Sequence, residues 1–235
     1  MNATTAPAVI ELVNVTKTYQ GPHSTHRVHA LRNTTLRIRS GELLAIEGPS
    51  GCGKSTLLHI LGTLDGPTDG RVILHGNDIA ELSDRELSAQ RAQHIGFVFQ
   101  RFFLLDSLTA LDNVATGLLY RRVPMPERRS RAEAALNHVG LGDRITHRPR
   151  ELSGGEQQRV AIARAIIGEP DLILADEPTG NLDSTAGQAI LQILRQLNRT
   201  GTAIAIVTHD HTIADTLPRR ITLRDGAITT DTSTP

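Results

Sequence analysis

Aromatic residues and cysteine are scarce in this chain, and tryptophan is absent. Only 3% of the 235 residues are aromatic, and Cys52 is the single cysteine. One cysteine excludes an intrachain disulfide framework and is typical of a reducing compartment. No run of residues approaches the roughly 18 apolar residues that a membrane span needs, and the N-terminus lacks the basic and apolar regions of a signal peptide. We therefore expect a cytosolic chain that is soluble when isolated.

An excess of charge of either sign is also missing. The sequence has 25 lysines and arginines against 25 aspartates and glutamates, so its formal net charge is zero. A neutral protein has no overall field that would attract nucleic acid or an anionic membrane surface. We therefore expect no nucleic-acid partner. The length fits one good-sized domain, with or without a subdomain.

Short apolar runs alternate with helical patterns along the chain. The runs are LLAIE (43–47), RVILH (71–75), IGFVF (95–99), DLILA (171–175) and AIAIV (203–207). Uninterrupted runs of this length predict strands buried on both faces, and their alternation with helices favours an α/β fold with a mostly parallel sheet. The segment 105–152 offers two helices, at 109–120 and 127–139, and no strand. Near the N-terminus, IELVNV and ALRNTTLRI alternate in polarity and predict an antiparallel flap.

A phosphate-binding loop is the clearest motif. Residues 48–55 read GPSGCGKS and match GxxxxGK[ST], after one apolar run and before a helix marked by Leu57. Backbone amides of such a loop surround phosphates, Lys54 neutralises the β- and γ-phosphate oxygens, and the Ser55 hydroxyl can coordinate Mg²⁺. The predicted nucleotide-binding residues here are Gly48, Pro49, Ser50, Gly51, Cys52, Gly53, Lys54, Ser55 and Thr56. Cys52 has two interpretations, a reactive thiol beside Lys54 and a small residue that fills the turn.

Acidic residues follow the run DLILA, which continues as Asp176, Glu177 and Pro178. An acid at the carboxyl end of a buried strand beside a phosphate loop suits a Mg²⁺ partner, and Glu177 can orient or deprotonate the attacking water. A solvated strand end is the alternative. His209 follows the run AIAIV and has two interpretations, a sensor of the γ-phosphate and a structural histidine.

The stretch ELSGGEQQRVAIARAI (151–166) predicts a helix that opens on glycines. Gly154 and Gly155 follow Ser153 directly, although each glycine costs about 1 kcal/mol relative to alanine inside a helix. Glycines allow a backbone to come close to a neighbour, and the free amides of a helix start attract anions. Because the stretch contains no lysine, it predicts half of a phosphate site.

Together these motifs resemble the ATP-binding cassette ATPases. Their order is GPSGCGKS, Gln100 after IGFVF, LSGGEQQ, LILADEP, NLD at 181–183 and His209, and it spans nearly the whole chain. The stretches at 62–70, 97–114 and 176–184 resemble the macrolide-exporter and lipoprotein-releasing branch. The resemblance implies a phosphate-loop NTPase fold in a single nucleotide-binding domain. Its RecA-like α/β core and antiparallel β flap would occupy 1–99 and 166–235, and a helical subdomain 100–165.

The resemblance also implies that two copies share their sites. Subunits of this family pair head to tail, so the signature residues of one copy would complete the ATP site of the other, with two ATP per dimer. These residues are Ser153, Gly154, Gly155 and Glu156, and Asp183 would link the two sites. Tyr19 matches the aromatic that stacks on adenine; its alternative is an ordinary core or surface tyrosine. The implied catalytic residues are Glu177, His209 and Gln100, and the implied Mg²⁺ ligands are Ser55, Gln100 and Asp176.

The loop after Gln100 is unusually apolar. It reads RFFLL, and Phe102 and Phe103 are half of the chain's four phenylalanines. These side chains have two interpretations, core of the helical segment and groove for a short helix of a membrane subunit. We expect a mixture of the two.

The implied function is ATP hydrolysis that drives separate membrane permeases of the MacB and FtsX type from the cytoplasmic face of the membrane. Export or extracytoplasmic mechanical work is favoured over uptake. One alternative is an ATP-driven signalling module that binds a membrane partner and moves no cargo. Another is a cassette ATPase of DNA repair or translation, against which the neutral charge and the single cassette argue. A phosphate-loop kinase is excluded chiefly because the LSGGE motif has no function in that class of enzyme.

Overall fold

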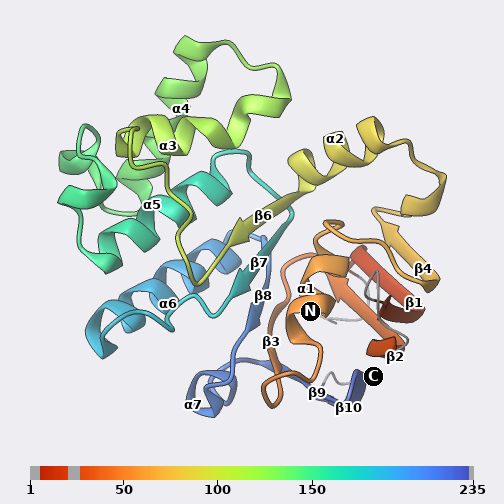
Figure 1. Ribbon diagram of the computed structural model, residues 1–235. Helices are drawn as coiled ribbons and strands as arrows, with labels where there is room; N and C mark the ends of the chain where they lie inside the picture. The colour runs from red at the N-terminus through yellow and green to blue at the C-terminus, as the bar shows by residue number, and fades with distance from the viewer. Residues whose placement is uncertain (1–5, 21–26, 233–235) are drawn as a thin grey trace. The chain divides into compact units, whose positions relative to one another are not determined.

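The computed structural model describes residues 6–20 and 27–232, and the chain divides into two compact units. The first unit lies within residues 1–87 and 203–235, and the second comprises residues 88–202. Figure 1 labels the α-helices and most strands of both. Among the described residues, no helix combines the length and the apolar character that crossing a bilayer requires.

Strands dominate the first unit. Its elements are β1 (Ala8–Gln20), β2 (Arg27–Arg39), β3 (Leu43–Glu47), α1 (Lys54–Leu61), β4 (Asp69–Leu74), β5 (Asn77–Asp78), the 3-10 helix η2 (Ile79–Glu81), β8 (Ala203–Val207), α7 (His211–Ala214), β9 (Arg219–Arg224) and β10 (Ala227–Asp231). One sheet has the order β2-β1-β4-β5 and is antiparallel. This sheet confirms the predicted flap. Elsewhere β3 lies between β8 and β9 and runs parallel to both.

The apolar run at 71–75 belongs to the antiparallel sheet, so its prediction as a parallel strand buried on both faces is wrong. It forms the end of β4, which pairs with β1 through Val72 and Leu12. Arg71 is exposed and Ile73 half-buried, whereas Val72 and Leu74 are buried. One face is therefore covered, and alternation between the faces is the pattern of a flap strand. By contrast, β3 and β8 are parallel and almost wholly buried, as predicted.

The second unit is mostly helical. Its elements are β6 (Ile95–Val98), α3 (Ala110–Ala115), η3 (Thr116–Arg121), α4 (Met125–His138), η4 (Gly142–Arg144), η5 (Pro149–Glu151), α5 (Gly154–Ile166), β7 (Leu172–Asp176) and α6 (Ser184–Arg199); α2 (Asp84–His94) enters it from the first unit. The predicted helix at 109–120 continues after Ala115 as the 3-10 helix η3, and α4 confirms the one at 127–139. In Figure 1, α3, α4 and α5 gather in one group, and these three helices contact one another.

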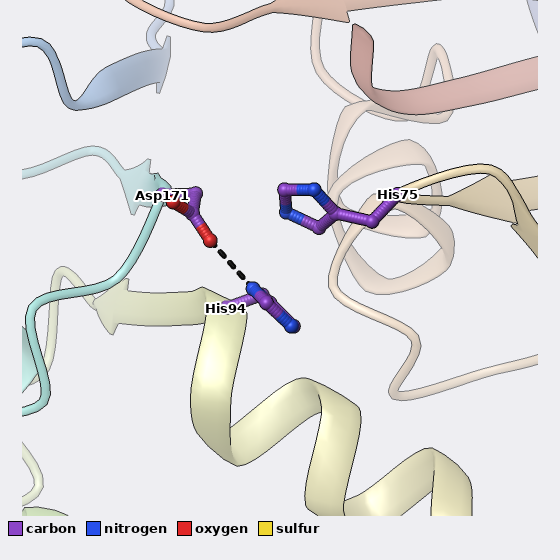
Figure 2. Close-up of side chains that lie close together, drawn as sticks. All are labelled: His75, His94 and Asp171. Carbon is purple, nitrogen blue, oxygen red and sulfur yellow. Dashed lines mark hydrogen bonds and ion pairs between the residues drawn. The ribbon is translucent and has the colours of Figure 1, made fainter. Parts of the chain in front are cut away.

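The strands β6 and β7 are parallel, with Ile95 opposite Leu172. Just before these residues, His94 ends α2 and Asp171 precedes β7. The His94 Nδ1 atom lies 2.5 Å from Asp171 Oδ2, as Figure 2 shows. This contact joins the two strands where they begin. Because the strands are parallel, their carboxyl ends, which Gln100 follows on β6 and Asp176 ends on β7, lie at one edge.

Candidate nucleotide site

The phosphate loop connects β3 to α1, and Gly53 is the N-cap of that helix. Gly53 has a φ of 106°, in the left-handed region that favours glycine. A Cβ atom there would lie 2.3 Å from the carbonyl oxygen of Ala30, so a side chain cannot be accommodated without a backbone shift. The first amides of α1 have no intrahelical acceptor and are available to an anion.

Lys54 lies back over this loop. Its Nζ atom donates to the carbonyl oxygens of Gly48 at 2.7 Å and Pro49 at 2.9 Å. Neutral carbonyls hold the ammonium in place without neutralising it, so a phosphate can replace them as a stronger partner. Cys52 is buried, with 4% of its surface exposed, and its carbonyl accepts from the Gly226 amide at 3.0 Å. Burial favours the interpretation of Cys52 as a residue that fills the turn.

A cavity of about 630 Å³ opens beside the loop. Its lining includes Lys54, Ser55 and Thr56 from α1, Tyr19 from β1 and Arg32 from β2. The volume lies within the range of small-molecule sites. Tyr19 is 40% exposed and lies in the lining of this cavity, so it is accessible there. The structure thus brings Tyr19 together with the phosphate loop, which is what a platform for the base of a bound nucleotide requires.

His209 is exposed and lies between β8 and α7. Its neighbours are fixed on both sides. The Thr208 amide donates to the Ile46 carbonyl at 3.1 Å, and Asp210 caps α7 by accepting from Thr212. Hydrogen bonds from the Thr212 hydroxyl and amide hold the pKa of Asp210 below its usual range. His209 is therefore carried by a short segment with anchored ends.

Glu47 is a buried carboxylate that the sequence interpretation missed. It is 5% exposed, its Oε2 lies 2.8 Å from His211 Nδ1, and its Oε1 accepts from the Thr222 hydroxyl at 3.1 Å. Glu47 precedes Gly48, and His211 is two residues after His209. The contact therefore joins the start of the phosphate loop to the segment that carries His209. In the sequence, the sign of this buried carboxylate is the acid that ends the otherwise apolar run LLAIE.

The carboxyl end of β7 carries Asp176, and Glu177 follows with a φ of 47°. The left-handed region is unusual for glutamate, and a following proline disfavours it further. The Gly180 amide closes the turn by donating to the Glu177 carbonyl at 3.0 Å. Backbone strain of about 1–3 kcal/mol persists only where the surroundings enforce it, and it concentrates at functional sites. Glu169 shares this conformation with a φ of 52°, so the conformation shows only that the surroundings enforce the turn, and the role of Glu177 rests on its chemistry and its place after Asp176.

Gln100 lies against the segment that follows these acids. Its Nε2 atom donates to Asn181 Oδ1 at 3.4 Å, and Asn181 Nδ2 donates to the Gln100 carbonyl at 2.9 Å. A Cβ atom on Gly180 would lie 2.8 Å from Gln100 Nε2, so glycine makes room for this side chain. The structure thus brings Gln100 to the turn that begins at Glu177. Asn181, which makes both contacts, was missed as a positioning residue.

The helix α5 opens as predicted, with Ser153 as its N-cap. The Ser153 hydroxyl accepts from the Glu156 amide at 3.3 Å, and Glu156 Oε2 accepts from the Ser153 amide at 2.8 Å. This reciprocal arrangement is a capping box. Hydrogen bonds from the Ser153 amide, and then from its hydroxyl, lower the pKa of Glu156. Glu156 therefore has a structural task within its own chain besides the nucleotide contact predicted for it.

The two signature glycines allow close packing inside the chain. A Cβ atom on Gly155 would lie 3.1 Å from the Ala186 Cβ, and one on Gly154 would lie 3.4 Å from Leu182 Cδ2. A side chain at Gly155 would require a shift of a few tenths of an ångström between α5 and the start of α6, whereas a Cβ atom on Gly154 would make only an ordinary van der Waals contact. Asp183, the residue between these contacts, is the N-cap of α6 and accepts from the Ala186 amide at 2.9 Å. The signature helix and the Asp183 segment are thus held together.

Gln158 is a polar residue of α5 that is fully buried, and the sequence interpretation did not single it out. Its Nε2 atom donates to the Pro178 carbonyl at 2.7 Å and to the Phe99 carbonyl at 3.4 Å. One amide therefore ties the signature helix both to the turn after Glu177 and to the residue before Gln100. Its signal is a glutamine on the buried face of an amphipathic helix.

Arg164, near the end of α5, holds the apolar loop after Gln100. Its guanidinium donates to the carbonyls of Phe103 at 2.6 Å and Phe102 at 2.8 Å, and burial lowers its pKa. Phe103 has a φ of 47°, and its side chain is 61% exposed, whereas Phe102 is half-buried. Phe102 is thus partly covered and Phe103 is exposed, and the expected mixture of core and docking groove stays a prediction.

Arg164→Met is expected to lower the free energy of unfolding by about 2–4 kcal/mol, because two charge-assisted hydrogen bonds are lost and two carbonyls lose their donor. Urea denaturation measures the change. Arg131→Met is the control, because Arg131 is half-exposed and forms an i,i+4 pair with Glu127, which contributes about 0.5 kcal/mol or less. Equal losses in the two variants would contradict the role assigned to Arg164.

Comparison with known proteins decides the family. The model of the ABC transporter family matches residues 31–180. The chain belongs to the ABC transporter family. It is an ATP-binding and ATP-hydrolysing cassette, and the resemblance found in the sequence is confirmed. An uncharacterised ABC transporter ATP-binding protein of Thermotoga maritima is 50% identical over 94% of the cassette and 93% of that protein.

Two further similar proteins bear on the fold and on the branch of the family. The macrolide export ATP-binding/permease protein MacB of Bartonella henselae is 48% identical over 98% of the cassette, which spans 35% of that longer protein. The solved dimer of the ATP-binding cassette MJ0796, in a post-hydrolysis state bound to ADP and Pi, is 45% identical. It matches 94% of the cassette and 97% of its own chain with a TM-score of 0.86. The predicted α/β cassette fold is confirmed.

Proposed function

We propose that this cassette is the ATPase subunit of a transport system in which two copies close head to tail on two Mg·ATP and drive separate membrane permeases. We propose that the system exports its cargo or performs extracytoplasmic mechanical work, and that it does not take up cargo. The observation that carries this proposal is the cavity of about 630 Å³ that Tyr19 shares with Lys54 and Ser55. The 48% identity to a macrolide export protein supports the direction, and the solved dimer of MJ0796 supports the pairing.

The chemistry assigned to the residues follows from their types and environments. Lys54 and the loop amides hold the phosphates, and Tyr19 carries the adenine. Glu177 orients the attacking water and accepts its proton, Gln100 contributes to the placement of that water, and His209 contacts the γ-phosphate. Anchored neighbours support these roles, because Gln158 holds the carbonyl after Glu177 and Asn181 holds Gln100.

Magnesium fits the donors that the cassette offers. Ser55 is exposed and presents a hydroxyl on α1, Asp176 presents a half-buried carboxylate at the end of β7, and Gln100 presents an amide oxygen. Oxygen donors of this kind are what the ion prefers, and it usually binds through few protein ligands together with substrate phosphates. Ser55, Asp176 and Gln100 are the proposed ligands. Bound Mg²⁺ would neutralise charge on the β- and γ-phosphates.

The partner copy would supply the remaining contacts. Ser153, Gly154, Gly155 and Glu156 are proposed to face the ATP held by the phosphate loop of the other copy, and Asp183 to connect the two sites. Gly154 and Gly155 leave the start of α5 without side chains, and free amides at a helix start attract phosphate. Pairing through a two-fold axis uses each such surface twice, which gives two ATP per dimer.

Exposed apolar side chains of the second unit suit a membrane partner. Phe103 and Leu105 lie in the loop after Gln100, and Leu119, Tyr120 and Met125 lie on η3 and at the start of α4, all more than half exposed. Large contiguous exposed apolar patches mark interaction sites, and Phe103 and Leu105 are close neighbours in one loop. We assign them to a short segment of the permease at the cytoplasmic face of the membrane.

Replacing Lys54 tests this function. Lys54→Ala is expected to weaken ATP binding by about tenfold and to reduce hydrolysis by about 10²-fold or more, because the cation that neutralises the phosphates is removed. Phosphate release and isothermal titration with ATP measure both. Arg71→Ala is the control, because Arg71 is an exposed cation on β4, away from the cavity lining. Parental hydrolysis by Lys54→Ala would contradict the proposal.

A further inference from the structure

Tyr19 belongs to a small network of charged and polar side chains within the first unit. Its hydroxyl donates to Asp65 Oδ2 at 2.8 Å. The other carboxylate oxygen, Oδ1, accepts from Lys17 Nζ at 2.6 Å, and the same ammonium donates to the Gly66 carbonyl at 2.8 Å. Lys17 Nζ also lies 4.9 Å from the centroid of the Tyr19 ring. Tyr19 and Lys17 thus each donate a hydrogen bond to one carboxylate oxygen of Asp65.

Strand geometry explains how the network forms. Lys17 and Tyr19 are two positions apart on β1, so their side chains leave the strand on the same face. The loop that carries Asp65 is fastened to that strand by backbone contacts. The Thr68 amide donates to the Thr16 carbonyl at 2.8 Å, and the Thr18 amide donates to the Thr68 hydroxyl at 3.0 Å. Asp65 therefore reaches the two side chains from an anchored loop.

The network restricts the Tyr19 ring at two places. Its hydroxyl is fixed by the hydrogen bond to Asp65. The Lys17 ammonium lies over the ring within cation–π distance. The ring is still 40% exposed and borders the cavity beside the phosphate loop. The contacts with Asp65 and Lys17 thus restrict the ring, and its accessible surface can still stack against a second planar group.

We propose that Asp65 and Lys17 are positioning residues that hold the Tyr19 ring as a ready-made stacking surface for the base of the bound nucleotide. This inference rests on the proposed function, in which Tyr19 carries the adenine. A freely rotating tyrosine would have to be ordered on binding, and ordering one side chain weakens affinity by about two- to tenfold. The network removes that cost before the nucleotide arrives. Its effect should therefore depend on the base and be absent for a ligand that has phosphates alone.

Two variants that keep the ring test the network. Asp65→Asn weakens the carboxylate contacts to Lys17 and Tyr19, and Tyr19→Phe removes the hydroxyl on which Asp65 acts. Each is expected to raise the Kd for ATP, and the KM for hydrolysis, about three- to tenfold with little change in kcat. Affinity for inorganic tripolyphosphate, measured by competition, should stay at the parental value. Asp69→Asn, an exposed carboxylate at the start of β4, is the control and should change neither affinity.

Tyr19→Ala separates the inference from the proposed function. Loss of stacking on an aromatic side chain is expected to weaken ATP binding by about tenfold or more. Parental ATP affinity in Tyr19→Ala would overturn the assignment of the adenine to Tyr19, and the inference with it. Weak binding by Tyr19→Ala together with parental binding by Asp65→Asn and Tyr19→Phe would overturn only the positioning role. Equal losses for ATP and tripolyphosphate would show that Asp65 merely fastens its loop, which also overturns it.

Spectroscopy gives a readout that a merely structural role would not move. The chain has no tryptophan and only two tyrosines, so in a Tyr120→Phe background the tyrosine absorbance reports on Tyr19 alone. Burial, and then the hydrogen bond to Asp65, raise the pKa of Tyr19. Asp65→Asn should therefore lower the midpoint of tyrosinate formation, and ATP should perturb the parental spectrum whereas tripolyphosphate should not. An unchanged midpoint in Asp65→Asn would overturn the network.

Discussion

Glu177→Gln is expected to bind ATP with parental affinity and to lose hydrolysis by about 10²- to 10⁴-fold. Glutamine keeps the size of glutamate but cannot accept a proton from the attacking water. The backbone at this position is held from both sides, since Gly180 donates to the Glu177 carbonyl and Gln158 donates to the next carbonyl, that of Pro178. The substitution therefore changes the chemistry of the side chain and leaves the turn in place.

Single-turnover hydrolysis and gel filtration with ATP measure the two halves of this expectation. A variant that binds ATP and does not hydrolyse it should accumulate as a dimer, because in the proposed function hydrolysis is the step that releases closure. Glu169→Gln is the matched control: Glu169 is exposed and has a φ of 52°, close to the 47° of Glu177. Parental turnover in Glu177→Gln, or an equal loss in Glu169→Gln, would contradict the assigned role.

Local patterns predicted much of this cassette from its sequence. The phosphate loop was predictable because the spacing of glycines, Lys54 and Ser55 is itself the chemistry, and a strand and a helix flank it. The start of α5 at Gly154 was predicted from the helical pattern that follows Ser153, and the structure adds that Ser153 caps this helix. Each of these features depends on fewer than twenty consecutive residues.

Features that depend on distant partners were not predictable. β9 begins with two arginines and was not predicted, since Arg219 is tolerated in the interior only because Glu42 and Asp231 each lie 2.7 Å from it. β4 was misassigned because its short apolar run does not say which strand it pairs with. The contacts of Gln158 and Arg164 likewise join carbonyls 20 to 62 residues away. No window of the sequence displays such pairings.

The second large effect is expected at Ser153. Ser153→Asp should abolish ATP-dependent dimer formation and lower hydrolysis by about 10³-fold, whereas Ser153→Asn should stay within about tenfold of the parental rate. Aspartate and asparagine are both good N-caps, so each preserves the start of α5. They differ in one negative charge. Two like charges about 4 Å apart near a protein surface repel by about 4 kcal/mol, which corresponds to about 10³-fold.

Thermal unfolding shows whether both variants keep the fold, and dimer formation is followed in the Glu177→Gln background. The comparison is made in a Glu156→Gln background, because the Glu156 carboxylate lies 2.9 Å from the Ser153 hydroxyl and would itself repel an aspartate there. In that background aspartate and asparagine would behave alike if Ser153 served only as a helix cap, and equal activity would remove Ser153 from the proposed ATP site. A loss confined to Ser153→Asp in that background would indicate that a phosphate lies near the residue, without telling which copy holds it.

Mixing two inactive variants decides which copy holds that phosphate. Lys54→Ala has a defective phosphate loop and an intact signature segment at Ser153. Ser153→Asp has an intact phosphate loop and a defective signature segment. In a head-to-tail pair of one copy of each, one site combines both defects, and the other combines the sound loop with the sound signature. Hydrolysis should therefore reappear on mixing, up to roughly a quarter of the parental rate for random pairing and independent sites. If Ser153 instead served the ATP of its own chain, every site would keep one defect and the mixture would stay inactive.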